Sequence, residues 1–224
     1  MSGRGKLIVI EGLDGSGKAT QTSLLSERLA EVGAAFRHVS FPDYKEPSSA
    51  LVKMYLHAEF GEAPEDVNAY AASSFYAVDR YASFKKHWEG DYLAGKLILA
   101  DRYATSNAIY QMVKLPAAEW DNYLSWLEEY EYRKLLLPPP DLVLYLDMPP
   151  ELSQKLLSGR YGGDESPKDL HEKNTAFLMR CRKAAVYSAE RLRWKVIDCA
   201  QGDAPRPVGD IAEEIWRTVR EVIG

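Results

Sequence analysis

A glycine-rich segment near its start constrains this 224-residue chain more than any other feature. Residues 12–18 read GLDGSGK and fit the pattern G-x-x-x-x-G-K, between a short apolar run at 7–10 and a helical pattern at 17–32. In that setting backbone N–H groups point at phosphate oxygens, the helix N-terminus adds its positive dipole end, and Lys18 reaches the β- and γ-phosphates. The segment predicts a nucleoside triphosphate site. Its residues are Gly12, Leu13, Asp14, Gly15, Ser16, Gly17, Lys18, Ala19 and Thr20.

One position of this segment departs from the usual motif. Ala19 stands where Ser or Thr normally ligates Mg²⁺, and Thr20 follows one residue late. Transferring phosphates still need Mg²⁺ to neutralise their charge. We therefore expect Asp101 to hold the ion, through water. Asp14 would repel phosphates, so we expect it to face another group such as a sugar hydroxyl; the alternative is a turn-forming aspartate.

Short apolar runs alternate with longer helical stretches along the whole chain. Strands that are apolar on both faces and alternate with helices are typical of a parallel sheet covered on both sides. The expected strands are 7–10, 36–41, 96–100, 142–146 and 195–199, and the expected helices are 17–32, 50–60, 68–94, 105–115, 117–136, 151–157, 171–193 and 208–223. The sequence predicts one α/β domain over 1–224, with about five strands, helices on both faces and a Gly- and charge-rich loop at 158–168.

Composition narrows the classes of protein and partner. Hydrophobic residues make up 46% of the chain and charged residues 27%, as in globular proteins, and the formal net charge is −5. An acidic chain disfavours coating of nucleic acid, and no apolar run approaches the length of a membrane span. Cys181 and Cys199 match no metal or redox spacing, and the first apolar run is too short for a signal peptide. We expect small-molecule partners, free thiols and a cytoplasmic location.

A second group of polar residues follows another predicted strand. Asp101, Arg102 and Tyr103 stand at the carboxyl end of the run 96–100, where open α/β sheets place their ligands. A carboxylate beside a guanidinium suits a site that joins Mg²⁺ to a second phosphate, because Arg binds phosphate bidentately. The alternative is a structural ion pair. Asn107 and Tyr110 follow three residues apart, on the helix side that would line the same cleft.

Two further positions have both a functional and a structural interpretation. Tyr76 and Arg80 are spaced to share one helix face, where a ring would stack on a base and a guanidinium would bind its edge. The alternative is an aromatic core residue, the role assigned to Phe75. Arg160, in the predicted loop 158–168, would close over phosphates and stabilise the transition state; the alternative is a solvated arginine.

Taken together, these residues resemble the thymidylate kinase family of nucleoside monophosphate kinases. Five blocks appear in the family's order across nearly the whole chain: EGLDGSGKATQ at 11–21, FP at 41–42, FYAVDR at 75–80, DRYATSNAIY at 101–110 and PDLVLYLDMPP at 140–150. The resemblance implies that Asp14 binds the 3′-hydroxyl of dTMP, Arg102 its 5′-phosphate and Arg80 the thymine edge. It also implies that Tyr110 lies against the sugar. The implied dTMP-binding set is Asp14, Phe41, Tyr44, Tyr76, Arg80, Arg102, Asn107 and Tyr110.

Some positions depart from the family pattern. The residue that stacks on the base is usually Phe, whereas this chain has Tyr76, which leaves the strictness of thymine preference open. Many members carry Arg after Phe-Pro, whereas Asp43 and Tyr44 follow here. Gly15 occupies the place where some members have an Arg in the phosphate loop, so the chain is similar to the subgroup whose lid supplies that Arg, here Arg160.

The resemblance implies an ATP- and Mg²⁺-dependent kinase that converts dTMP to dTDP as a homodimer. Lys18 would bind the donor, Arg102 the acceptor and Arg160 the migrating phosphoryl group, with Asp101 organising Mg²⁺. One alternative is a kinase for another deoxynucleotide or a deoxynucleoside. Another is a nucleotide-sensing switch, which the absence of the guanine-reading pattern N-K-x-D disfavours: the four asparagines are followed by Ala, Ala, Tyr and Thr.

Overall fold

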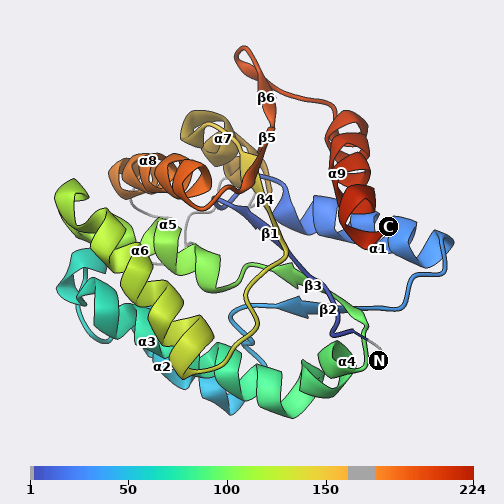
Figure 1. Ribbon diagram of the computed structural model, residues 1–224. Helices are drawn as coiled ribbons and strands as arrows, with labels where there is room; N and C mark the ends of the chain where they lie inside the picture. The colour runs from blue at the N-terminus through green and yellow to red at the C-terminus, as the bar shows by residue number, and fades with distance from the viewer. Residues whose placement is uncertain (1–2, 161–174) are drawn as a thin grey trace.

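A five-stranded parallel sheet forms the centre of the molecule. The computed structural model describes residues 3–160 and 175–224 (Figure 1). The strand order is β2-β3-β1-β4-β5, and every neighbouring pair is parallel. The strands are β1 (Leu7–Gly12), β2 (Phe36–Ser40), β3 (Leu97–Asp101), β4 (Leu142–Asp147) and β5 (Lys195–Asp198). The predicted α/β class and the five predicted strands are confirmed.

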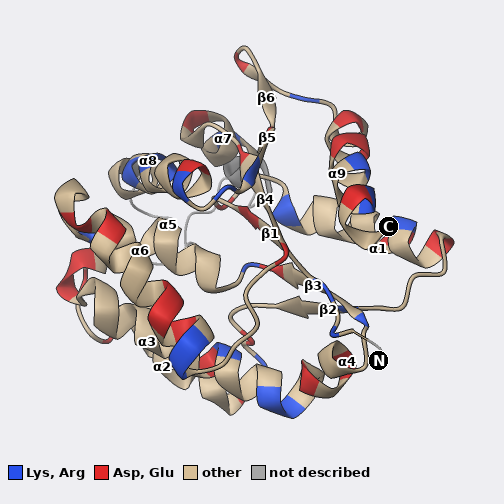
Figure 2. Ribbon diagram, in the orientation of Figure 1, with Lys and Arg blue, Asp and Glu red and all other residues tan. Residues whose placement is uncertain are grey.

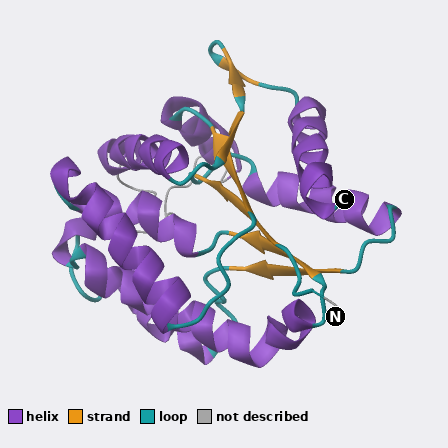
Figure 3. Ribbon diagram, in the orientation of Figure 1, coloured by secondary structure: helices purple, strands orange, loops and turns teal. Residues whose placement is uncertain are grey.

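Helices cover both faces of this sheet, as Figure 3 shows. Successive residues of a strand point to opposite faces, so Leu7 and Val9 belong to one apolar cluster and Ile8 and Ile10 to the other. Helices α1 (Lys18–Glu31) and α9 (Val208–Ile223) pack on the face of Ile8. The opposite face carries α3 (Ala69–Ser83), α5 (Asn107–Tyr110), α6 (Trp120–Glu128) and α8 (Thr175–Arg191).

Shorter elements connect these layers. The remaining helices are α2 (Ala50–Leu56), α4 (Glu89–Leu93) and α7 (Pro150–Arg160), and β6 (Ala200–Gln201) with β7 (Ala204–Pro205) forms a small antiparallel hairpin. Turns of 3-10 helix lie at Pro47–Ser49, Pro64–Asp66, Ala104–Ser106, Met112–Lys114 and Ala117–Glu119, and π-helical turns at Phe84–Trp88 and Glu129–Lys134.

Several predicted bounds are wrong. The helix predicted at 68–94 begins as expected, with the Asn68 side chain accepting the N–H of Ala71 at 2.9 Å, but a π-helical turn interrupts it at Phe84–Trp88. Residues 158–160, predicted as loop, continue helix α7 to Arg160, because no proline stops it and one glycine costs a helix only about 1 kcal/mol. The rest of the predicted lid loop, and the start of the helix predicted at 171–193, lie outside the described residues.

Many charged residues lie along the outer helices (Figure 2). Figure 2 shows acidic and basic residues interspersed along α9. An ion pair joins α9 to α1: a guanidinium nitrogen of Arg28 in α1 lies 3.3 Å from a carboxylate oxygen of Glu213 in α9. Such exposed pairs contribute at most about 1 kcal/mol. No helix within 3–160 or 175–224 is long and apolar enough to cross a bilayer.

Candidate active site

The glycine-rich segment forms a tight loop between β1 and α1. A Cβ atom on Gly12 would lie 2.4 Å from the Ser16 hydroxyl oxygen and 3.0 Å from the Leu146 carbonyl oxygen, so only glycine fits there. Gly17, directly before α1, has φ +90°, which other residues rarely adopt. The loop therefore turns sharply and directs the N-terminus of α1 at the space beside it. An anion-binding end of this kind is what the sequence predicted.

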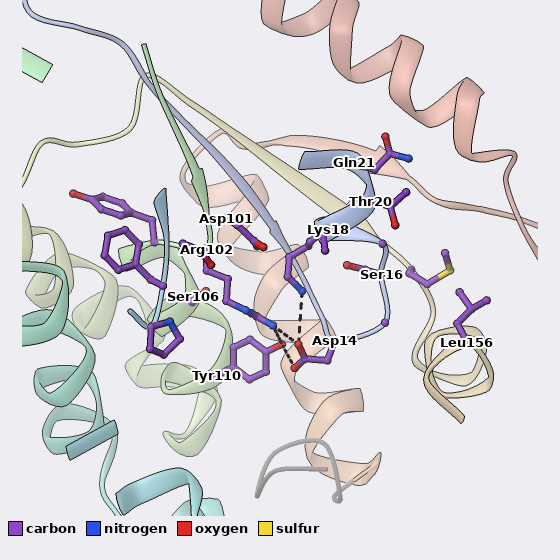
Figure 4. A pocket seen from close by; sticks show the side chains of 18 of the residues that line it. Asp14, Ser16, Lys18, Thr20, Gln21, Asp101, Arg102, Ser106, Tyr110 and Leu156 are labelled. Carbon is purple, nitrogen blue, oxygen red and sulfur yellow. Dashed lines mark hydrogen bonds and ion pairs between the residues drawn. The ribbon is translucent and has the colours of Figure 1, made fainter. Parts of the chain in front are cut away.

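Four side chains from three segments meet beside this loop, as Figure 4 shows. The Lys18 ammonium nitrogen donates to the Leu13 carbonyl at 3.0 Å and lies 3.7 Å from an Asp14 carboxylate oxygen. The Arg102 guanidinium donates to that same oxygen. The Tyr110 hydroxyl donates to the other Asp14 oxygen at 3.1 Å. One carboxylate thus lies between two cations that come from the ends of β1 and β3.

Burial and neighbouring charges set the protonation of these groups. Burial lowers the pKa of Lys18, the positive charge of Arg102 lowers it further, and Asp14 opposes both effects. Burial alone would lower the pKa of Arg102, but the Asp14 carboxylate raises it well above its ordinary value. Arg102 therefore stays charged at any physiological pH. The site concentrates positive charge where two anionic groups would have to approach one another.

A buried carboxylate that the sequence interpretation did not assign shapes the same turn. Glu11 accepts hydrogen bonds from the Tyr103 backbone N–H at 3.2 Å, the Thr105 hydroxyl at 2.7 Å and the Ser106 hydroxyl at 2.8 Å. Its burial raises its pKa, which the charge of Arg102 and these hydrogen bonds partly offset. Glu11 thus anchors the backbone that carries Arg102. The sequence feature that could have indicated this role is the position of Glu11, an acidic residue directly after the apolar run 7–10.

The predicted base-binding residues lie on other elements than the phosphate loop, with Tyr76 and Arg80 on α3 and Asn107 on α5. Arg80 is almost completely buried, and its guanidinium forms two hydrogen bonds to the Glu131 carboxylate. The Asn107 side-chain nitrogen donates to Glu131 at 3.1 Å. Tyr76 packs edge-on against Tyr55, with 6.4 Å between ring centroids. Neither the pairing of Arg80 nor the role of Glu131 was predicted.

A cavity of about 640 Å³ joins the phosphate loop to these base-side residues. Most of the predicted site residues line it. They are Asp14, Gly15, Ser16, Gly17, Lys18, Ala19, Thr20, Phe41, Tyr44, Tyr76, Arg80, Asp101, Arg102, Asn107 and Tyr110. Gly12 and Leu13 form the loop without lining the cavity, and the side chain of Arg160 lies outside the described residues. A cavity of this volume, lined by both groups of residues, is large enough for small-molecule ligands.

Comparison with known proteins identifies the family. The family model described as thymidylate kinase matches residues 10–208. The chain belongs to the thymidylate kinase family. It is 30% identical over 184 residues to the thymidylate kinase of Mycobacterium tuberculosis strain H37Rv, which covers 81% of this chain and 84% of that one. It is 28% identical to the human thymidylate kinase, over 97% of this chain and 94% of that one.

A solved structure agrees with the family at the level of the fold. The thymidylate kinase of Candida albicans superimposes with a TM-score of 0.69, at 24% identity, over 97% of this chain and 92% of that one. The predicted family, fold and enzyme class are therefore confirmed. Members of the family are phosphotransferases that convert dTMP to dTDP.

Kinases of this family use ATP, whose phosphates require a divalent metal, and the residues at the end of β3 fit Mg²⁺. Asp101 lines the cavity, and its oxygen Oδ1 is buried without a hydrogen-bond partner in the described part of the chain. No group of three or more His, Cys, Asp or Glu residues forms a metal cluster there. Mg²⁺ typically takes one or two carboxylates, waters and substrate phosphates rather than an all-protein cage. One carboxylate oxygen in this position suits that mode.

The sequence interpretation also missed one wall of the cavity. This wall consists of Pro205 at the end of β7, Arg206, and Val208 at the start of α9. The Gln21 side-chain amide donates to the Val208 carbonyl at 3.1 Å and ties this wall to α1. The dipeptide Gly202-Asp203 was the available signal, because a two-residue Gly-Asp turn between short extended runs is typical of a hairpin.

Proposed function

We propose that this chain transfers the γ-phosphoryl group of ATP·Mg²⁺ to the 5′-phosphate of dTMP. The observation that carries the proposal is the meeting of Lys18 and Arg102 at one cavity, which the phosphate loop, Arg80 and Asn107 also line. A single triphosphate site would need only the first of these cations. The second suits an acceptor that is itself phosphorylated.

The chemical task is to bring two anionic molecules into line. Lys18 and the loop N–H groups bind the phosphates of the donor, and Arg102 binds the acceptor phosphate bidentately. Lys18 and Arg102, which both pair with Asp14 in this structure, would exchange that carboxylate for the phosphates, and Asp14 would then bind the 3′-hydroxyl of the acceptor. Binding in this geometry converts a collision of like charges into an in-line displacement within one complex.

Other groups support this arrangement. Bound Mg²⁺ would neutralise charge on the phosphate oxygens, and Asp101 would hold it through water. We assign the migrating phosphoryl group to Arg160 on the family resemblance alone. Pro205, Arg206 and Val208 line the cavity and are tied to α1 through Gln21, so we assign this wall to the base of the donor.

The acceptor has alternatives within the same enzyme class. Tyr76 stands where the family usually has Phe, so another deoxynucleotide remains the second candidate. A deoxynucleoside is disfavoured, because it brings no phosphate for Arg102. We also propose that the chain acts as a homodimer in the cytoplasm; both cysteines are free and buried, which suits a reducing compartment.

Initial-rate measurements with ATP and one acceptor at a time test the proposal. ADP release is followed with dTMP, dUMP, dGMP, AMP and thymidine, and we expect the highest kcat/KM with dTMP. Lys18→Ala, purified in the same way, controls for contaminating kinases and should lose roughly 100-fold or more. Best turnover of thymidine would make the protein a nucleoside kinase. Slow ATP hydrolysis that ignores every acceptor would make it a switch.

A further inference from the structure

Glu131 holds both base-side residues but does not itself line the cavity. It lies in the π-helical turn Glu129–Lys134 and is completely buried. Its carboxylate accepts from Arg80 Nε at 2.8 Å, from Arg80 Nη2, and from Asn107 Nδ2 at 3.1 Å. Arg80 and Asn107 line the cavity, whereas Glu131 is absent from its lining. One carboxylate therefore positions two groups that face the base site.

The orientation of the Asn107 amide follows from its neighbours. Its nitrogen Nδ2 donates to Glu131 and, at 3.3 Å, to the backbone carbonyl of Ser73. Both neighbours are acceptors, so the reversed amide would place an oxygen against two oxygens. The nitrogen is thus turned toward the protein. The amide oxygen Oδ1, to which no donor within the described residues forms a hydrogen bond, is left for the cavity.

The Arg80 guanidinium is fixed in the same way. Nε and Nη2 donate to Glu131, while Nη1 has, among the described residues, only a long contact of 3.5 Å with the Tyr103 carbonyl. Burial alone would lower the pKa of Arg80, but Glu131 raises it above its ordinary value, so the guanidinium stays charged. The base site therefore offers a donor from Arg80 and an acceptor from Asn107.

This pair of groups matches one kind of pyrimidine edge. Thymine and uracil present a donor at N3 and an acceptor at O4, whereas cytosine presents an acceptor at N3 and a donor at N4. A cytosine in this site would place its N3 acceptor against the Asn107 amide oxygen and its N4 donor against the Arg80 N–H. Buried polar groups left without partners are what give such sites their strongest discrimination.

We propose that Glu131 is a specificity-determining positioning residue, which orients Asn107 and Arg80 so that the site accepts a pyrimidine with N3–H and a C4 carbonyl and rejects one with a C4 amino group. The inference rests on the proposed function, because it presumes that dTMP binds here. Loss of Glu131 would free the Asn107 amide to rotate, and its nitrogen would then donate to cytosine N3.

Glu131→Gln tests this at nearly constant side-chain size. Glutamine offers one acceptor oxygen where Glu131 uses two, so it cannot hold all three N–H groups. We expect the ratio of kcat/KM for dTMP to that for dCMP to fall on the order of 10-fold, mainly through a higher KM for dTMP. dUMP should fall in parallel with dTMP, because it presents the same edge. Glu128→Gln, an exposed position one turn earlier, makes the same charge change and should keep the wild-type ratio.

Two further variants separate positioning from a merely structural role. Glu131→Asp keeps the charge of the buried pair, so it should fold even where Glu131→Gln does not, but its shorter side chain cannot reach both Arg80 and Asn107. We expect the dTMP:dCMP ratio to fall in this variant as well. In an Asn107→Ala background, Glu131→Gln should lower the ratio by less than it does alone, because only one of the two groups that it orients, Arg80, is still present.

A folded Glu131→Gln or Glu131→Asp variant with the wild-type ratio would overturn the inference. So would an equal further loss in the Asn107→Ala background. These outcomes are distinct from failure of the proposed function, which would appear as wild-type protein without dTMP-dependent turnover. Wild-type activity on dTMP with an unchanged ratio in the variants would reject the role of Glu131 alone.

Discussion

At the scale of single residues, the conformation of Arg102 links strain to function. Its φ is +64°, a left-handed conformation that costs an ordinary residue about 1–2 kcal/mol. The backbone is held there by a hydrogen bond from its N–H to the Ile10 carbonyl at 3.0 Å and by the contact of Glu11 with the next residue. Such strain persists only where the surroundings over-determine it, and it gathers at functional sites. In this site the strained residue is Arg102, whose guanidinium donates to Asp14.

Two substitutions at this position separate stability from activity. Arg102→Gly and Arg102→Ala both remove the guanidinium, so each should lower kcat/KM for dTMP by about 10³-fold or more. Only glycine relieves the left-handed strain, so urea denaturation should find Arg102→Gly about 1 kcal/mol more stable than Arg102→Ala. Ala58→Gly, at φ +62° outside the cavity, is the matched control and should gain stability without losing activity. Equal stability of the two Arg102 variants would show that the left-handed backbone at this position is not strained.

At the scale of elements, the sequence predicts best where burial leaves a simple pattern. The inner strands β1, β3 and β4 are buried along most of their length, and α9 has one apolar stripe, so these elements lie within two residues of their predicted bounds. The helix predicted at 105–115 is instead a series of short helical pieces. Residues 107–113 are buried on every side, so no periodicity marks where one piece ends. The same burial conceals which of its side chains face the cavity.

Lys114, at the end of the turn Met112–Lys114, links this turn to α2 and to the segment before α3 through a half-buried amine. Its ammonium nitrogen donates to the Tyr55 hydroxyl and to the Val67 carbonyl, each at 2.9 Å. Burial lowers its pKa from 10.5 to about 7, against a small opposing effect of Glu65. Between these pH values the unfolded chain carries a proton that the folded chain lacks. The free energy of unfolding therefore rises with pH over that window.

Lys114→Met should remove this pH dependence. Urea denaturation at pH 7, 8 and 9 should show the stability of the wild type, relative to the variant, growing by up to about 1.4 kcal/mol per pH unit. Any constant offset reports the lost hydrogen bonds, whereas the slope reports titration of the amine. Lys183→Met, at an exposed position of α8, is the control and should leave the slope unchanged. A pH-independent difference for Lys114→Met would mean that the amine does not titrate in this range.

At the scale of the whole molecule, the site is divided between what is local in the sequence and what is not. The phosphate loop and the turn at Arg102 follow single strands, and because β1 and β3 are parallel neighbours their carboxyl ends lie together. That juxtaposition follows from the fold class, so it could be predicted. The Arg80–Glu131 pair joins positions 51 residues apart, and Glu131 lies in an acidic run typical of a solvated helix. Its burial depends on its partner, which one sequence does not reveal.

Helix α3 contributes to the active site and also carries a candidate face for the proposed homodimer. One of its faces carries Arg80 into the cavity, while Tyr70, Val78 and Tyr81 are 38%, 43% and 42% exposed along another. Exposed apolar stripes of this kind mark protein contacts, and a two-fold dimer is the commonest closed assembly. The proposed homodimer therefore has a candidate face behind the base site.

Light scattering at micromolar concentration tests this arrangement. We expect about twice the chain mass of 25.3 kDa for the wild type, and the single-chain mass for Val78→Asp, because a buried carboxylate without a partner opposes association. Val186→Asp, equally exposed on α8 at 46%, makes the same change elsewhere and should leave the dimer intact. A single-chain mass for the wild type would reject the dimer. A Val78→Asp variant that stays dimeric would show that the dimer interface does not lie on α3. The catalytic assignments would still stand, because none of them uses a residue from a second copy.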